Sequence, residues 1–383
     1  MAEQQSTPSS APAPTGSPAP AGTAEAGGIE TGGPAPSSAR VGGTFTVDDA
    51  VELAVVDRNG FVESRHIGSA VVVGPDGEVE LQVGDIEAPV FPRSSLKPFQ
   101  AIAAMQAGAP LVGEQVALAC ASHVGSREHM ELAAAMLAKA GLSEDDLRCP
   151  TAWPQDGPAR TALTRGELEI GGRTLAAEKS RLAFNCSGKH AAFLWACVEN
   201  GWDLETYLDA DHPLQRHVVE VVEEFAGERI AHLAVDGCGA PVPAFSLRGL
   251  ARAVGRLAAA PSNKNANARA ATVATAMLDY PWAVHGEGED NTVVMEDLGI
   301  ICKLGAEGVL VLGAPDGTAC AVKILDGNGR AATLVGLTLM AAAGAVQPEQ
   351  LGPVLEKTTR PILGGGEPVG RIRLAAPVLA LLD

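Results

Sequence analysis

The 383-residue chain lacks several features that would place it in a membrane or on a nucleic acid. It has no run of 18 or more apolar residues, which is the length that a membrane-spanning helix needs. It also has no basic patch, and its formal net charge is −18. Because nucleic acids and anionic membrane surfaces repel a protein of that charge, we expect neither as a partner. The sequence therefore predicts a soluble protein.

The start of the chain also lacks the basic and apolar regions of a secretory signal and the arginine richness of a transit peptide. Residues 1–42 are almost wholly Ala, Pro, Ser, Gly, Thr, Gln and Glu. That composition buries too little apolar surface to offset chain entropy. We expect a disordered tail over residues 1–42 and one catalytic domain over residues 43–383. Seven cysteines, an odd number without an export signal, predict reduced thiols and a cytoplasmic location.

Strand-like and helix-like patterns are segregated along the chain. Apolar residues alternate over 51–56, 69–73 and 79–83, with turn sequences between them, which predicts an antiparallel meander. Helical periodicity follows Ser94. Further helical patterns cover residues 130–140, 191–200, 214–225, 246–259, 266–278 and 332–343, and strand patterns return at 308–312, 320–325 and 369–374. We therefore expect an α+β fold with a mainly antiparallel sheet and helices on its faces.

The first candidate site is a Ser-x-x-Lys pattern, Ser94 and Lys97, at a change from strand to helix. Residues three apart share one face of a helix, so this spacing puts a hydroxyl and an amine one turn apart. The lysine can take the serine proton only if burial or a neighbouring cation lowers its pKa. A helix cap followed by a surface lysine would give the same pattern.

Two later segments carry a serine or a lysine beside a turn. Ser122 and His123 precede a helix, but neighbours on an extended segment point to opposite faces, so His123 cannot be assumed to act as the base for Ser122. Lys303 begins a Lys-x-Gly pattern similar to the Lys-Thr-Gly strand of penicillin-recognising enzymes. A capped turn and a solvated lysine would explain the same residues.

Two cysteines lie in turns that contain glycine. Cys186 belongs to Asn-Cys-Ser-Gly-Lys-His at 185–190, and Cys238 belongs to Asp-Gly-Cys-Gly at 236–239. Two thiolates suit zinc better than calcium or magnesium. The sequence has neither a Cys-x-x-Cys pair nor a full set of four ligands, and buried unliganded cysteines would look the same.

Taken in order, these segments resemble the thermolabile asparaginase II family, whose members hydrolyse L-asparagine to L-aspartate and ammonia. Members of that family resemble serine β-lactamases and penicillin-binding proteins in fold. The likeness spans about residues 47–374, and the hexapeptide at 185–190 is its most specific part. The segment Lys-Ile-Leu-Asp-Gly at 323–327 looks like a further family segment.

The resemblance implies an amidohydrolase with two Ser/Lys pairs, a bound zinc ion and L-asparagine as substrate. The pairs are Ser94 with Lys97 and Ser122 with Lys303, and Ser94 is the expected nucleophile. The resemblance also implies a homodimer. The implied substrate contacts come from Arg93, His123 and Asp236, and the implied zinc ligands are Cys186, Lys189 and Cys238.

Two positions depart from the family pattern. After Cys149 the family has a segment like Gly-x-His, whereas this chain has Pro-Thr-Ala at 150–152. Glu289 stands where the family often has a basic residue. If Glu289 faces the substrate carboxylate, affinity for asparagine should suffer.

Two other functions use the same features. A penicillin-interacting hydrolase also carries Ser-x-x-Lys and Lys-x-Gly, but no convincing Ser-x-Asn lies between them here. A zinc-stabilised protein that binds a small amide without turnover would keep the scaffold and the metal. Only turnover distinguishes this binding protein from the asparaginase.

Overall fold

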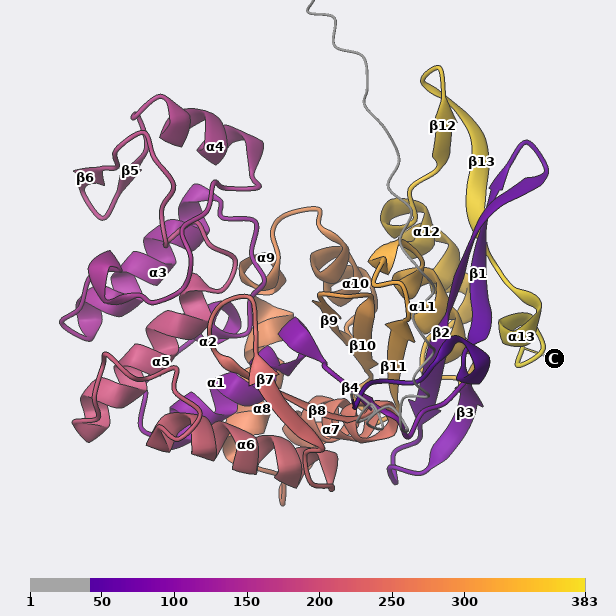
Figure 1. The fold of residues 1–383 in the computed structure, drawn as a ribbon, viewed down its shortest axis with the longest axis horizontal. Helices are drawn as coiled ribbons and strands as arrows, with labels where there is room; N and C mark the ends of the chain where they lie inside the picture. The colour runs from indigo at the N-terminus through magenta and orange to yellow at the C-terminus, as the bar shows by residue number, and fades with distance from the viewer. Residues whose placement is uncertain (1–41, 383) are drawn as a thin grey trace, which may run out of the picture. The chain divides into compact units, whose positions relative to one another are not determined.

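Strands from both ends of the chain meet in one antiparallel sheet (Figure 1). The computed structural model describes residues 42–382. The sheet has eight strands in the order β12-β13-β1-β2-β11-β10-β9, and β3 pairs with β2 outside this path. Their bounds are β1 Val51–Arg58, β2 Phe61–Val73, β3 Val79–Val83, β9 Ile301–Gly305, β10 Val309–Gly313, β11 Ala319–Ile324, β12 Ile362–Gly364 and β13 Glu367–Leu374. There are two smaller antiparallel sheets in the described part of the chain. One contains β4 (Pro89–Val90), β8 (Pro241–Ser246) and β7 (His232–Val235), in that order. The other pairs β5 (Glu169–Ile170) with β6 (Arg173–Thr174).

The predicted meander is confirmed, with one difference in length. β1 pairs with the first part of β2, and β3 pairs with its last residues along the same edge. β2 begins at Phe61, not near Ser69 as the alternation predicts. Its first residues have only β1 beside them in the sheet and are largely exposed, so they carry no apolar signal.

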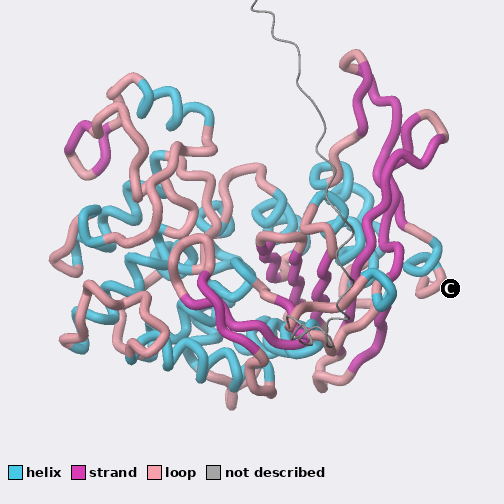
Figure 2. Tube along the Cα trace, in the orientation of Figure 1, coloured by secondary structure: helices cyan, strands magenta, loops and turns pink. Residues whose placement is uncertain are grey.

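Helices occupy the middle of the chain and its last part, and Figure 2 shows most of them gathered beside the large sheet. Their bounds are α1 Lys97–Gln106, α2 Glu114–Ala119, α3 Arg127–Lys139, α4 Gly157–Thr164, α5 Ser187–Asn200, α6 Pro213–Ala226, α7 Leu247–Ala259, α8 Ala268–Asp279, α9 Pro281–Val284, α10 Asp290–Leu298, α11 Ala332–Ala342, α12 Pro348–Thr358 and α13 Ala376–Leu379. The long predicted helices are all present. The helices α2, α4, α9, α10, α12 and α13 were not predicted; all of them except α12 are shorter than ten residues and contain too few turns to show a periodicity.

Helices cover both faces of the sheet, as expected for the α+β class. A methyl group added at Gly313 on β10 would meet Val254 of α7, whereas one added at Gly336 of α11 would meet Leu310 and Leu312 of β10. Successive residues of a strand point to opposite faces, so α7 and α11 pack on opposite faces of β10. The α+β prediction with a mainly antiparallel sheet is therefore confirmed.

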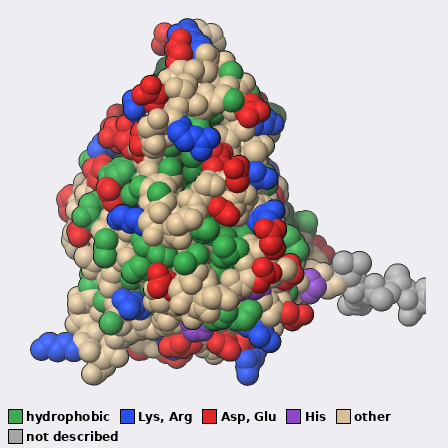
Figure 3. Space-filling model, turned by 90° about the vertical axis from the view of Figure 1, so that its left-hand side faces the viewer, with side chains coloured by type: hydrophobic (Ala, Val, Ile, Leu, Met, Phe, Trp, Pro, Cys, Tyr) green, Lys and Arg blue, Asp and Glu red, His purple; other side chains and the backbone are tan. Residues whose placement is uncertain are grey.

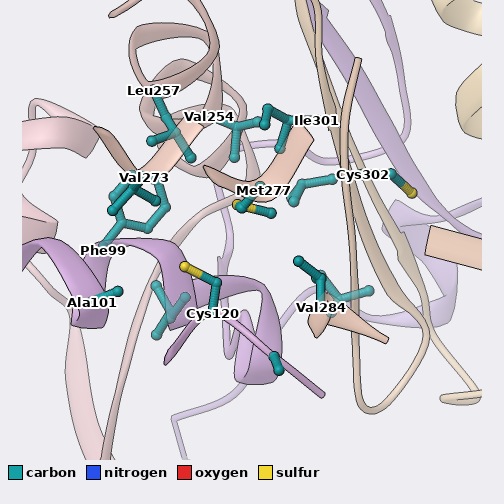
Figure 4. Packing of buried hydrophobic residues seen from close by; sticks show 14 of the residues in the cluster. Phe99, Ala101, Cys120, Val254, Leu257, Val273, Met277, Val284, Ile301 and Cys302 are labelled. Atoms are coloured by element: carbon teal, nitrogen blue, oxygen red, sulfur yellow. The ribbon is translucent and has the colours of Figure 1, made fainter. Parts of the chain in front are cut away.

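The hydrophobic core continues from the sheet into the group of helices beside it. Phe99 of α1, Cys120, Met277 of α8 and Ile301 of β9 are all buried in one cluster (Figure 4). Full burial of an aromatic side chain such as Phe99 stabilises the fold by about 1.5–3 kcal/mol. This cluster includes Cys120, two residues before Ser122, and Ile301 of β9, the strand that carries Lys303, so both site segments are anchored in the same core.

The face drawn in Figure 3 is mixed in charge and also exposes hydrophobic side chains. On this face, Asp and Glu side chains are interspersed with Lys and Arg. None of the described helices is long and apolar enough to cross a bilayer. The predicted tail lies outside the described residues, except for Gly42.

Candidate active site

The hydroxyl of Ser122 lies between two buried lysine amines. Lys97 Nζ donates to Ser122 Oγ at 3.0 Å, and Lys303 Nζ lies 2.8 Å from the same oxygen. Both lysine side chains are almost fully buried, at 1% and 0% relative exposure. The three residues come from sequence positions up to 206 apart, and the fold brings them to one point.

The segment that carries Ser122 contacts the backbone of two other helices, α9 and α5. Ser122 follows α2, and its N–H donates to Val284 O at 2.9 Å. Gly188 in the first turn of α5 lets that helix approach closely, because a methyl group there would lie 2.4 Å from Leu118 O of α2. The glycine of the Asn-Cys-Ser-Gly-Lys-His hexapeptide therefore sets the distance between the segment that carries Ser122 and α5.

Lys303 lies within β9, whereas the sequence pattern predicts that it comes before a strand. It pairs with Val311, which points to the same face of β10 as Gly313 and so toward α7. Gly305 ends the strand, and a methyl group there would lie 2.5 Å from Pro92 O. The glycine of the Lys-x-Gly pattern thus allows β9 to approach the Ser94 segment.

The electrostatic surroundings of Lys303 favour its neutral form. Burial, and after it the nearby charge of Lys97, lower the pKa of Lys303 from its usual 10.5 to about 7. Lys303 also donates to Leu304 O at 2.8 Å. At neutral pH a substantial fraction of Lys303 is therefore a free amine that can accept a proton.

Ser94 and Lys97 lie one turn apart, as the Ser-x-x-Lys spacing predicts. Ser94 belongs to a short 3₁₀-helix, Arg93–Leu96, and Lys97 begins α1. Besides Ser122, the amine of Lys97 donates to Ala121 O and to Asn185 O, the latter at 3.3 Å. The half-buried Ser94 hydroxyl makes no side-chain hydrogen bond within residues 42–382. In this conformation both lysines contact Ser122, and Ser94 is left unengaged.

Arg93 links the Ser94 segment to the cysteine segment. Its backbone has a φ of +55°, a left-handed value that is uncommon for a residue with a side chain and concentrates at functional sites. Arg93 Nε donates to Asp236 Oδ1 at 2.6 Å, and Glu307 lies 3.9 Å from the same guanidinium. Asp236 is therefore already neutralised by a cation before any substrate binds.

His123 is a buried, structural histidine in this conformation. Its Nδ1 accepts from Gly125 N at 3.1 Å, and its Nε2 lies 2.9 Å from Ser187 Oγ. Burial and the neighbouring His129, whose ring stacks on it at 4.9 Å, lower the pKa of His123 well below its usual value. Because both ring nitrogens are engaged, His123 positions the loop after Ser122 and leaves no ring nitrogen for a substrate.

The three predicted zinc ligands lie together. Lys189 Nζ is 3.0 Å from Cys238 Sγ, and Cys186, Lys189 and Cys238 are each at most 4% exposed. A hydrogen bond from the Cys186 thiol and the ammonium of Lys189 lower the pKa of Cys238. Burial by itself lowers the pKa of Lys189, but the two sulfurs outweigh it and the pKa is raised. Without a metal, the pair is therefore a buried thiolate and ammonium.

This donor set fits a zinc ion, with one condition. Two thiols and one amine supply three protein ligands, the number typical of a zinc site that keeps an open position. Among residues 42–382, no group of three or more Cys, His, Asp or Glu is arranged to hold a metal, so the set depends on Lys189. Zinc binding would require Lys189 to lose its proton, because only a neutral amine coordinates a metal.

Three further residues belong to the site but were not predicted from the sequence. His190 Nδ1 contacts Tyr207 Oη at 2.7 Å, and its buried Nε2 has no hydrogen-bond partner among the described residues. Burial, followed by the charges of Lys303, His129 and Lys97, lowers the pKa of His285 to about 3. His190 belongs to the hexapeptide and could have been included on that ground, whereas Tyr207 and His285 lie in no recognisable motif.

A cavity of about 440 Å³ lies beside the loop that follows Ser122. Val124, His129, Trp282 and Gly286 form part of its wall, and Glu289 also lines it. At the other departure from the family pattern, Ala152 forms a two-residue bridge with Ser180. Glu289 therefore faces a space that a small substrate can enter, whereas the Ala152 backbone is engaged within the fold.

Comparisons with known structures give distant similarities. The chain is similar to Mglu in its native form, with 16% identity and a TM-score of 0.37, over 71% of this chain and 63% of the Mglu chain. It is also similar to a β-lactamase from Mycobacterium bovis, with 18% identity and a TM-score of 0.38, over 76% of this chain and 95% of that chain. The chain thus spans less than two thirds of Mglu. No curated protein matches the sequence significantly.

The sequence matches the L-asparaginase II family over residues 54–374, which is most of the chain. This range contains every residue of the two clusters described above. Family membership implies amidohydrolase chemistry on an amide substrate. The chain therefore belongs to the L-asparaginase II family.

Proposed function

We propose that this protein is an L-asparaginase that hydrolyses the side-chain amide of L-asparagine to L-aspartate and ammonia. The observation that carries the proposal is the Lys97–Ser122–Lys303 array, in which a hydroxyl is bonded to two buried amines and one amine is partly neutral at pH 7. An amidohydrolase needs a group that removes a proton from its nucleophile and returns a proton to the leaving amine.

The contacts of the array support one arrangement of its protons. Lys97 contacts three acceptors, Ala121 O, Asn185 O and Ser122 Oγ, which matches the three donors of an ammonium. Lys303 contacts Leu304 O and Ser122 Oγ, which matches a neutral amine that donates to the carbonyl and accepts from the hydroxyl. The resting pair thus carries one positive charge, on Lys97.

Ser122 connects the two amines as a proton relay. When Lys97 donates a proton to Ser122 and Ser122 passes its own to Lys303, Lys97 becomes the neutral base. Lys97 then removes the proton of Ser94, which attacks the substrate amide carbon. Lys303 returns its proton through Ser122 to the leaving nitrogen, so ammonia departs and the lysines regain their resting charges. Water hydrolyses the resulting ester of Ser94.

Ser94 fits the role of nucleophile because its hydroxyl is not engaged by the protein, while Ser122 is held between two amines. Arg93 and Asp236, which form an ion pair beside Ser94, are suited to contact the α-carboxylate and α-amino groups of the substrate. His123 keeps a positioning role through its bonds to Gly125 and Ser187.

We also propose that Cys186, Lys189 and Cys238 hold a zinc ion. The ion would act as a Lewis acid that orients the substrate next to the serines. The cysteine cluster adjoins the Ser/Lys cluster, which supports this proposal. Asn185 O accepts a hydrogen bond from Lys97, and the next residue in the chain is Cys186.

The test is ammonia release from L-asparagine by the purified protein, with L-glutamine as a second substrate. Ser94→Ala should lower kcat at least about 10³-fold. Ser143→Ala, which removes an exposed serine near α3, is the control and should keep the wild-type rate. Wild-type turnover in Ser94→Ala would show that another residue is the nucleophile. If neither amide releases ammonia, the binding protein without turnover becomes the better interpretation.

The penicillin-interacting alternative is tested separately with nitrocefin. We expect no hydrolysis of nitrocefin, because the proposed substrate is a linear amide and nitrocefin is an amide in a strained ring. Nitrocefin turnover without asparagine turnover would reverse the assignment.

We further propose a cytoplasmic homodimer. All seven cysteines are buried and free, which supports a reducing compartment. Light scattering of the purified protein tests the oligomeric state, and a monomer at micromolar concentration would contradict the dimer.

A further inference from the structure

A second cavity lies where α6, α7 and α8 meet the turn between β2 and β3. It encloses about 350 Å³, within the range of small-molecule sites. The end of α6, one side of α7, the start of α8 and the segment before it, and this turn supply most of its lining residues. None of the groups assigned above to amide hydrolysis lines it.

Two arginines one helical turn apart reach into this cavity. Arg252 and Arg256 of α7 both line it, and both guanidinium groups approach the same point. A methyl group placed on Gly227 would lie 3.5 Å from Arg252 Nη1 and 3.7 Å from Arg256 Nη2. Gly227, which ends α6 in the left-handed conformation, lies beside both cations but lines a neighbouring hollow with Glu223 and Glu228, and it does not line this cavity.

The two guanidinium groups bond only to carbonyl oxygens within residues 42–382. Arg252 makes two long contacts of 3.4 Å to Gly77 O, and Arg256 donates to Glu224 O at 2.8 Å and Phe225 O at 3.1 Å. No described carboxylate lies within 4.0 Å of either group. Each arginine carries five donors, so several remain for a ligand.

Two carboxylates also line the cavity, but neither pairs with the arginines. Asp76 accepts from Glu78 N at 3.0 Å and so caps its own turn. The carbonyl of Glu224, and not its carboxylate, accepts from Arg256. The two arginines that line the cavity are therefore not paired with either of these carboxylates.

The opposite wall is polar at one end and apolar at the other. Asn263 and Asn267 lie before α8, and the Asn267 side chain caps that 12-residue helix by accepting from Arg269 N and Ala270 N. Phe225 and Ala270 supply apolar surface next to them. The cavity thus combines two cations with an apolar wall, which suits an anionic group attached to a small apolar body.

We propose that this cavity, which both Arg252 and Arg256 line, is a binding site for a small organic anion with a carboxylate or phosphate group. The site is separate from the proposed asparaginase centre, so the two proposals can fail independently. The planar guanidinium groups bind an oxyanion through parallel hydrogen bonds, and phosphate offers them one more oxygen than carboxylate does.

The test is isothermal titration calorimetry of the full chain with phenyl phosphate, benzoate and benzyl alcohol. We expect both anions to bind, phenyl phosphate more tightly, and the neutral alcohol not to bind. Arg252→Gln and Arg256→Gln should each weaken anion binding at least tenfold. Arg160→Gln, which removes an exposed arginine on α4, is the matched control and should bind as the wild type does.

A variant that keeps both charges makes the test independent of folding defects. Ala266→Leu narrows the cavity at a partly exposed position and should also weaken binding, with an unchanged melting temperature. Absence of anion binding at millimolar concentration, or equal loss in Arg160→Gln, would overturn the proposal.

Discussion

Lys303 Nζ and Ser122 Oγ lie 2.8 Å apart, and the lysine that makes this contact is fully buried. A buried lysine is costly unless it becomes neutral, and neutrality is the property that a general base requires. The same burial that destabilises the charged form of Lys303 therefore prepares the site for proton transfer.

The first prediction concerns the pH dependence of turnover. The pKa of Lys303 is about 7, so the neutral form increases as the pH rises through that value. We expect kcat/KM for L-asparagine to rise between about pH 6 and pH 8 and then level off. Lys303→Arg should abolish this rise of kcat/KM with pH, together with most of the activity, because arginine stays protonated. A pH-independent rate over this range in the wild type would contradict the role of Lys303.

The second prediction concerns stability. The pKa of Lys303 in the folded chain lies below its usual 10.5, so the unfolded chain binds more protons between about pH 7 and 10.5. The contribution of this residue to stability therefore rises with pH in that window. We expect Lys303→Met to be more stable than the wild type at pH 6, and the gain to shrink at pH 10, as measured by urea denaturation. An inactive variant with no gain at pH 6 would indicate that burial of this amine costs nothing.

The third prediction concerns Gly305, whose missing side chain lets β9 meet the Ser94 segment. Gly305→Ala places a methyl group 2.5 Å from Pro92 O. We expect a loss of about 1–3 kcal/mol in stability and a fall in kcat, because Lys303 moves with the strand. Gly352→Ala in α12 has open space around it and should keep full activity. Equal behaviour of the two variants would argue against close packing at Gly305.

The fourth prediction concerns substrate affinity. Glu289 lines the cavity beside the loop that follows Ser122, and its negative charge repels an anionic substrate that enters this space. Glu289→Arg should lower KM for L-asparagine about tenfold, because it replaces a repulsive charge on the entry path with an attractive one. Glu349→Arg, an exposed change of equal charge on α12, should leave KM unchanged. A fall in KM in both variants would point to the overall charge instead of this position.

The fifth prediction concerns the metal. Cys186→Ser and Cys238→Ser should each reduce the zinc content of the purified protein from about one ion per chain to nearly none, as measured by elemental analysis. Cys320→Ser removes another buried thiol, on β11, and should retain the metal. If Cys186→Ser and Cys238→Ser both retain zinc, these two cysteines are not the zinc ligands.

The sequence predicts the fold more fully than it predicts the geometry of the site. Apolar runs, alternation and helical periodicity locate β1, β3, β10, β11 and most of the long helices, because burial of both faces of a strand or of one face of a strand or helix determines these patterns. Lys303 escapes this reasoning, since a lysine in the middle of a buried strand breaks the apolar pattern. Tyr207 and His285 reach the site through tertiary packing, which no local pattern records.

The pairing of the site residues could not be read from spacing either. The Ser-x-x-Lys interval places Ser94 and Lys97 one turn apart, but the amine of Lys97 turns toward Ser122, which is 25 positions away. A long flexible side chain selects its partner among all acceptors that the fold brings near. The sequence order of the motifs indicates the family, and only the folded chain shows the shared hydroxyl.

The central claim is that Ser94 forms an ester with the aspartyl group while Ser122 relays protons between the two lysines. Rapid quenching of the wild-type reaction with L-asparagine, followed by peptide mass mapping, tests this directly. We predict an aspartyl adduct on the peptide that contains Ser94, and its absence in Ser94→Ala. An adduct on the peptide that contains Ser122, or turnover by Ser94→Ala, would contradict the account.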